Sequence, residues 1–266
     1  MRIFDYEFLS KNPPYAAILS AFFVFLGMIS AYFFFSSAMS LVMVSFSSLL
    51  LLPYVTRILK TDKIKGSYRF SGILKRYDKL IGFYIYLFFG MSLSYMLLYI
   101  ILAPAINERA FSSQVSLIIP GPVGFYFNPD IFTQIIANNL TIVFVCVLLS
   151  LFYGTGSIFI LNYNASVLGV MYGSAVRPLV WGAGSVPIVF ANMLAYVPHT
   201  LLEVLAYLLA AISGGILSNA LIMNSGSGDS KKIGLLLRDS IFFLILSVIL
   251  ILAGGFIETV IPPLFS

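Results

Sequence analysis

Residues 12–56 read NPPYAAILSAFFVFLGMISAYFFFSSAMSLVMVSFSSLLLLPYVT, and these 45 positions contain no charged side chain. About 20 apolar residues cross the roughly 30 Å core of a bilayer, so the stretch is long enough for two membrane-spanning helices. Ser36 and Ser37 indicate where the chain turns between them. We therefore predict a helical pair over Tyr15–Phe35 and Ala38–Val55.

Long apolar stretches continue along the rest of the chain. Of all residues, 60% are hydrophobic and 9% are charged, and the mean hydropathy is +1.02, which excludes a soluble enzyme, a disordered chain and a nucleic-acid-binding domain. We expect further helices at Leu80–Leu102, Ile135–Leu161, His199–Met223 and Ser240–Val260. The predicted fold is an all-α, polytopic transmembrane helix bundle with six clear spans, built as a single integral membrane domain over residues 1–266.

Between the fourth and fifth predicted helices, residues 162–198 differ from an ordinary span. Glycines and prolines divide them into short apolar pieces, and two of the breaks are the Arg177-Pro178 step and Pro187. Proline removes a backbone donor and disfavours a helical residue before it. We expect a broken or re-entrant segment with two short helices of about ten to fourteen residues, whose freed backbone groups are buried in protein or line a wet cavity.

The distribution of charge predicts the orientation in the cell membrane. Residues 57–79 carry eight basic and two acidic residues, and loops rich in Lys and Arg stay in the cytoplasm. This loop and the N-terminus are therefore predicted to be cytoplasmic, and the loop 103–129, with one Arg, external. The loop before the last helix is also basic, so an even number of crossings must separate the two basic loops. One crossing then has to lie within residues 162–198.

Polar residues at membrane depth are the candidate functional residues. A helix that starts at Pro198 or His199 carries His199 and Glu203 on one face, because they are four residues apart. Such a pair is costly in a membrane and is a functional-site hypothesis, although Glu203 could also lock the segment by accepting a hydrogen bond from His199 or Arg177. We expect neither residue to face lipid. The predicted polar intramembrane cluster consists of His199, Glu203, Asn138, Asn139, Asn164 and Arg177.

Amides and small residues at membrane depth also have a purely structural interpretation. Asparagines such as Asn162 can form hydrogen bonds between helices, and glycines let helices approach closely. The predicted helix-packing glycines are Gly154, Gly156, Gly169, Gly173, Gly214 and Gly215.

The sequence contains few of the motifs that indicate a catalytic site. The chain has one histidine and one cysteine, Cys146, which excludes the usual Cys/His zinc clusters, and it has no HExxH motif. No aspartate lies within a predicted span. We therefore predict a protein that is not an enzyme and has no metal or cofactor.

The order of several motifs resembles the stage II sporulation protein M family of integral membrane proteins. The motifs are Asn138-Asn139, the glycines Gly154 and Gly156, Asn164 followed by Gly169, Pro198-His199, Glu203 and Gly214-Gly215. The resemblance covers roughly residues 79–262, and the helix pair and basic loop of residues 1–78 look like those of archaeal-type members. It implies a membrane anchor, since the family's namesake holds a cell-wall-remodelling complex whose hydrolytic activities belong to its partners.

Two functions remain open at this point. The first is a non-enzymatic protein that organises or anchors a membrane or cell-envelope complex, with protein partners or a second copy of itself bound at loops 57–79 and 103–129. The alternative is a transporter or channel in which the broken segment and the polar cluster line a polar path. A cavity around Glu203 that reaches both membrane faces favours transport, and a dry, tightly packed core favours the anchor.

Overall fold

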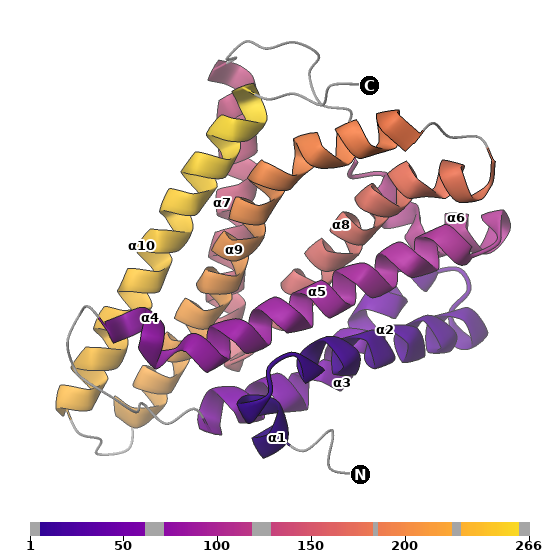
Figure 1. Ribbon diagram of the computed structural model, residues 1–266. Helices are drawn as coiled ribbons and strands as arrows, with labels where there is room; N and C mark the ends of the chain where they lie inside the picture. Colours follow the sequence, from indigo (N-terminus) through magenta and orange to yellow (C-terminus); the bar gives the residue numbers. More distant parts are fainter. Residues whose placement is uncertain (1–5, 62–71, 119–128, 183–185, 225–229, 261–266) are drawn as a thin grey trace.

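The computed structural model describes residues 6–61, 72–118, 129–182, 186–224 and 230–260, and every regular element among them is helical (Figure 1). The helices are α1 (Tyr6–Lys11), α2 (Tyr15–Phe34), α3 (Met39–Thr61), α4 (Ile73–Arg76), α5 (Asp78–Ile101), α6 (Pro104–Val115), α7 (Pro129–Tyr153), α8 (Ser157–Val180), α9 (Val186–Asn224) and α10 (Ser230–Val260). Within the described residues six helices are long and apolar enough to cross a membrane, namely α2, α3, α5, α7, α9 and α10. The predicted all-α polytopic bundle is confirmed.

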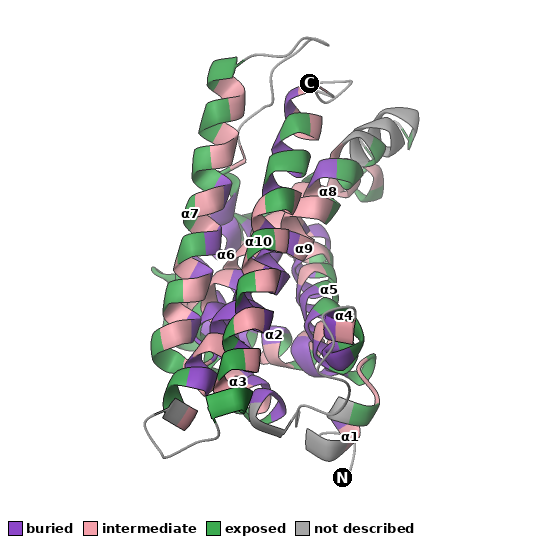
Figure 2. Ribbon diagram, turned by 90° about the vertical axis from the view of Figure 1, so that its left-hand side faces the viewer, coloured by how far each residue is buried: buried purple, intermediate pink, exposed green. Residues whose placement is uncertain are grey.

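The helices form two groups that meet along α8. In one group α9 packs along α10 and α7, and in the other α5 packs along α8 and α2, while α3 lies against α2 (Figure 1). Figure 2 shows α7 and α10 with exposed residues along their outward faces. Phe144 of α7 and Ile245 and Ile249 of α10 are exposed apolar side chains. Apolar side chains on outward faces suit contact with lipid tails, which are as apolar as leucine.

Asn162 joins three helices at the centre of the bundle. Its fully buried amide donates to the Val44 carbonyl oxygen (3.0 Å) and to the hydroxyl oxygens of Ser47 (2.8 Å) and Ser48 (2.9 Å). It also accepts a hydrogen bond from the Tyr95 hydroxyl (3.1 Å). This amide therefore forms interhelical hydrogen bonds that link α8 to α3 and α5, as the sequence predicts. Its buried polar atoms all have hydrogen-bond partners within the protein.

The fourth predicted helix, Ile135–Leu161, is divided in the structure. α7 ends at Tyr153, and Leu161 belongs to α8. Gly154, between the two helices, has a φ of 68°, which residues with a side chain rarely adopt. The chain turns here, and the sequence hides the turn because apolar residues continue without a charge on both sides of it.

Residues 162–198 are not one continuous helix, as predicted, but the interruption lies at a different place. α8 passes through Pro178 to its end at Val180, and the break follows at Gly182, whose φ is 79°. A glycine in this conformation is a common helix terminator. The prediction of two helices of ten to fourteen residues is wrong, since α8 has 24 residues and α9 has 39.

The expected helix start at Pro198 or His199 is also wrong. α9 begins at Val186 and continues through Pro198. Pro187 occupies the second position of α9, where a missing backbone donor costs no helical hydrogen bond, and prolines inside membrane helices are tolerated because neighbouring groups satisfy the freed backbone. His199 and Glu203 still share a face, now within a continuous helix.

The start of α10 lies at the same end of the bundle as the start of α5 (Figure 1). At this end a buried ion pair joins Arg76 in α4 to Asp239 in α10, and Asp239 also accepts from Tyr77 (3.3 Å) and Arg238 (2.9 Å). The expectation that no aspartate lies within a span needs correction. Asp239 is fully buried in α10, where Arg76 compensates its charge.

Candidate functional site

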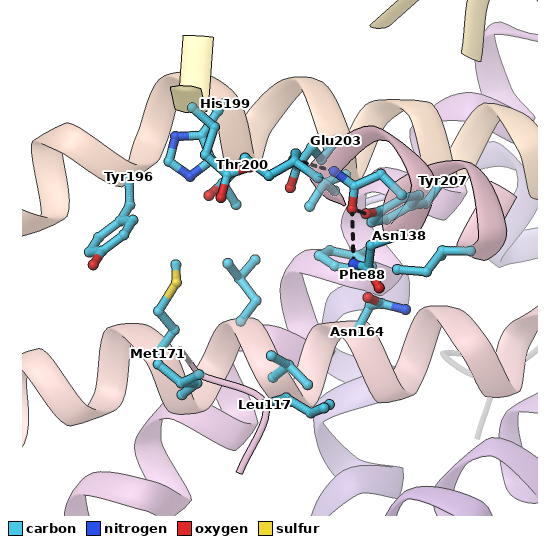
Figure 3. Close-up of a pocket in the computed structure, with 18 residues that line it drawn as sticks. Phe88, Leu117, Asn138, Asn164, Met171, Tyr196, His199, Thr200, Glu203 and Tyr207 are labelled. Carbon is cyan, nitrogen blue, oxygen red and sulfur yellow. Dashed lines mark hydrogen bonds between the residues drawn. The ribbon is translucent and has the colours of Figure 1, made fainter. Parts of the chain in front are cut away.

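A pocket of about 290 Å³ lies where α7, α8, α9 and α10 meet. We call it the polar pocket. Figure 3 shows its α9 wall with His199, Glu203 and Tyr207, which faces Asn164 and Met171 on α8. Its polar lining residues are Asn138, Asn139, Asn164, Tyr196, His199, Thr200, Glu203, Tyr207 and Glu258.

A chain of hydrogen bonds runs along one wall of the polar pocket. The Tyr207 hydroxyl donates to Asn139 Oδ1 (2.7 Å), and Asn139 Nδ2 donates to Glu203 Oε1 (2.6 Å). The carboxyl group of Glu258, on α10, lines the same pocket. Three helices, α7, α9 and α10, thus place two carboxyl groups side by side.

Gly254 allows this approach of α10 to α9. A Cβ atom at Gly254 would lie 3.3 Å from Glu203 Cγ and 3.4 Å from the His199 carbonyl oxygen, so there is little room for a side chain. Glu258 follows Gly254 by four residues and therefore lies on the same face of α10. The close contact at Gly254 brings Glu258 to Glu203.

His199 lies beside the carboxyl groups. It is only 6% exposed, its ring packs edge-on against Tyr196 with 5.9 Å between the ring centroids, and its Nδ1 has no hydrogen-bond partner. The hydrogen-bond donor to Glu203 is Asn139, rather than His199 or Arg177 as the locking interpretation expects. A buried ring nitrogen without a partner leaves hydrogen-bonding capacity unused in the pocket wall.

The structure brings five of the six predicted cluster residues together. Asn138, Asn139, Asn164, His199 and Glu203 all line the polar pocket. Asn138 is exposed at its edge, and the Asn164 amide donates only to the carbonyl oxygen of Ile160 in its own helix (2.8 Å).

Arg177 lies apart from the cluster. Its guanidinium group donates to the backbone carbonyl oxygens of Tyr99 and Leu102, at 2.9 Å in the second case, and lies 5.3 Å from the ring centroid of Trp181. These carbonyl groups belong to the end of α5, where a helix leaves acceptors unsatisfied and favours a positive charge. Arg177 therefore caps α5.

Sequence reasoning missed Glu258, Tyr207 and Tyr196. Glu258 follows the charge-free stretch Ser240–Ile257 near the end of the predicted span Ser240–Val260, and the predicted polar cluster does not include it. A signal for it existed, because it follows Gly254-Gly255 by one helical turn, and paired glycines indicate close helix packing. Tyr196 and Tyr207 have no comparable signal in the sequence, because aromatic residues make up 16% of the chain.

The predicted packing glycines divide into two kinds. A Cβ atom at Gly169 or Gly214 would lie within 3.0 Å of a neighbouring helix, at 2.7 Å from the Ser92 carbonyl oxygen and 2.6 Å from Ser150 Cβ respectively. Gly173 and Gly215 also face neighbouring helices, with side-chain atoms 3.1 Å away. Gly154 and Gly156 instead belong to the turn between α7 and α8.

The lining chemistry of the polar pocket suits a cation. Among the residues described, neither lysine nor arginine lines it, so an anion would meet two carboxyl groups without a compensating charge. Within the same residues no group of three His, Cys, Asp or Glu side chains is arranged to hold a metal ion. Carboxyl and amide oxygens, together with the aromatic rings of Phe88, Tyr196 and Tyr207, are the groups available for binding.

Comparison with known proteins gives one match. A family model described as Stage II sporulation protein M matches residues 20–263. No curated protein and no solved structure matches the chain. The family match begins within α2, so it includes most of the first helix pair, and it extends to the polar pocket and Glu258.

Proposed function

This chain belongs to the stage II sporulation protein M family, and we propose that it moves a small polar solute across the membrane through the polar pocket. The chain is a multi-pass membrane protein, with six candidate spans among the described residues. The observation that carries the proposal is the pocket itself, which holds Glu203 and Glu258 between spanning helices. Ionisable side chains at membrane depth are expensive and typically mark substrate or ion pathways.

A second cavity supports a route along α9. It measures about 210 Å³ and is lined by Thr56 and Leu59 of α3, by the turn at Gly154, and by Gly215 and Ser218 of α9. The polar pocket lies against the earlier part of α9, from Tyr196 to Tyr207. The two cavities therefore face different ends of one helix.

The part of α9 between the cavities is closely packed. Ala210 and Ala211 are fully buried, and Gly214 leaves no room for a Cβ atom against Ser150 and Val147 of α7. Small residues let the two helix backbones approach closely. In the proposed cycle, movement of α7 against α9 opens a path through this closely packed region and closes the polar pocket to the opposite side of the membrane. Other carriers with a central site work in the same way.

Cysteine accessibility tests the proposal without knowledge of the solute. A cysteine at Asn164, on the α8 wall of the polar pocket, is placed in a Cys146→Ala background and reconstituted in liposomes of sorted orientation. Asn164 bonds only to its own helix, so the substitution should be tolerated. A transporter exposes the pocket alternately to both sides, so a membrane-impermeant methanethiosulfonate reagent should label the cysteine from either side.

Cysteines at two exposed positions calibrate the sides. Ser112 lies on α6 and Ser230 begins α10, and the predicted cytoplasmic N-terminus and basic loop place them outside and inside respectively. Each should label from one side only. Labelling of the Asn164 cysteine from a single side, with both controls working, would contradict transport.

The second candidate is the non-enzymatic anchor of a cell-envelope complex. The observation in its favour is a polar surface at the predicted external end of the bundle, where Ser36 and Ser37 between α2 and α3 lie beside Glu108, Arg109 and Ser112 of α6. Protein partners, or a second copy of the chain, could bind there. One-sided labelling of the pocket, together with a stable partner that copurifies in mild detergent and is lost on substitution of Glu108 and Arg109, would favour this role.

A further inference from the structure

Glu203 and Glu258 both line the polar pocket, and neither lysine nor arginine lines it among the described residues. Two neighbouring carboxylates repel each other in a low-dielectric site, so the pair is most stable when one of the two groups holds a proton. Such a pair titrates as a unit rather than as two separate residues. With one shared proton, the two carboxyl groups carry a single negative charge.

No other described charge near the pair changes this count. The ionisable groups that face it are His199, Tyr196 and Tyr207 of α9 and, through Tyr207, Cys146 of α7. α8 and α5 contribute Asn164, Met171 and Phe88, which do not ionise. The pair therefore has no fixed counter-ion among the described lining residues. A bound cation would compensate its remaining negative charge.

The size and lining of the polar pocket indicate what kind of cation fits. A volume of about 290 Å³ is many times that of a bare ion and lies near the lower end of small-molecule sites. Phe88, Tyr196 and Tyr207 line it together with the carboxyl groups. Aromatic faces attract organic ammonium groups, and the unpartnered, buried Nδ1 of His199 offers one further polar contact.

We propose that the polar pocket binds a small organic ammonium ion in exchange for the proton that Glu203 and Glu258 share. This inference rests on the proposed transport function and names its substrate class. One cation enters and one proton leaves to solvent, so the pair changes from one carboxylate and one carboxylic acid to two carboxylates facing one positive charge. The net charge of the site stays at minus one in both states, which avoids adding charge to a low-dielectric interior.

Calorimetry on the purified protein in detergent tests this exchange. Tetramethylammonium is the probe, because it has no ionisable proton of its own. Titrations in two buffers of different ionisation enthalpy give the number of protons released per bound cation, and we expect about one. Sodium chloride at the same concentration should neither bind with similar affinity nor displace the probe.

Conservative variants distinguish a loss of cation binding from a loss of the folded structure. Glu258→Gln and Glu203→Gln keep the volume but leave no shared proton to release, so the probe should bind at least about tenfold more weakly and without proton release. Glu108→Gln, on exposed α6, should bind like wild type. Circular dichroism and thermal unfolding confirm that each variant is folded.

Absence of probe binding in the wild type, binding without proton release, or unchanged release in Glu258→Gln would each overturn the inference. Equal competition by sodium would overturn the organic ammonium class. These outcomes are distinct from failure of the transport proposal. Proton release with one-sided labelling at Asn164 keeps the exchange site and removes transport, whereas two-sided labelling without proton release keeps transport and removes the exchange.

Discussion

Replacement of Gly169 by alanine tests the packing of the bundle most sharply. A Cβ atom at this position would lie 2.7 Å from the Ser92 carbonyl oxygen, 2.7 Å from Tyr95 Cβ and 2.8 Å from the Met96 nitrogen, all in α5. Two of these atoms are backbone, so a rotamer change cannot relieve the clash. α5 and α8 would have to separate along a contact that also holds the Asn162 hydrogen bonds.

The expected cost follows from two opposing terms. Overpacking a tight contact costs about 1–3 kcal/mol, and exchange of glycine for alanine inside a helix returns about 0.5–1 kcal/mol. Gly169→Ala should therefore lower the free energy of unfolding by about 1–2 kcal/mol. Gly234→Ala is the matched control, because Gly234 also lies in a helix and a Cβ atom there meets nothing within 4 Å.

Unfolding in mixed micelles with increasing sodium dodecyl sulfate, followed by circular dichroism, measures both variants. Gly234→Ala should be as stable as wild type or slightly more stable, since only the helix-propensity term acts. A Gly169→Ala protein as stable as the Gly234→Ala protein would refute the close approach of α5 and α8.

Three further predictions concern polar side chains. Asn162→Ala removes two N–H donors that three buried oxygens share and the acceptor for Tyr95, and should cost about 2 kcal/mol at roughly 0.6 kcal/mol for each of three hydrogen bonds. Asn164→Ala removes one bond within its own helix and should cost no more than about 0.6 kcal/mol; equal stability of the two in the same assay contradicts the central role of Asn162. Asp239→Ala leaves a buried arginine without its partner and should cost about 3–5 kcal/mol, and loss of no more stability than in Glu108→Ala would rule out the buried pair. Glu203→Gln should stay within about 1 kcal/mol of wild type because it keeps an acceptor for Asn139, whereas Glu203→Leu should lose about 1–3 kcal/mol; a Leu variant with wild-type thermal stability removes Glu203 from the hydrogen-bonded wall.

The sequence was sufficient for the fold class and for most residues of the polar pocket. Six spans could be predicted because membrane insertion depends on apolar length, which is read directly from charge-free stretches such as residues 12–56. His199 and Glu203 stood out because ionisable residues are rare at membrane depth. Their partner Asn139 could be proposed as an amide at similar depth, but its pairing with Glu203 could not, since 64 residues separate them.

The positions of the helix breaks were harder to predict. Proline predicts the end of a helix, yet α8 and α9 pass through Pro178 and Pro198 and the break lies at Gly182. The helix-breaking effect of proline is a poor guide here, because neighbouring helices and side chains can satisfy the backbone groups that proline leaves without a hydrogen bond. Asp239 and Glu258 flank the charge-free stretch Ser240–Ile257, and a charge in that position does not reveal that the helix continues past it with the side chain facing other helices. At 31 residues and 1.5 Å per residue, α10 is about 46 Å long.

Flux in proteoliposomes tests the central claim, that the Glu203–Glu258 pair carries a solute across the membrane. Vesicles that contain the protein, tetramethylammonium and a pH-sensitive dye are diluted into medium without the cation, with the membrane potential clamped at zero. Exchange predicts acidification of the lumen as cations leave and protons enter, at equal rates in wild type and Glu108→Gln and at background rate in Glu203→Gln. A lumen whose pH changes no faster with the wild-type protein than in protein-free vesicles would contradict the account.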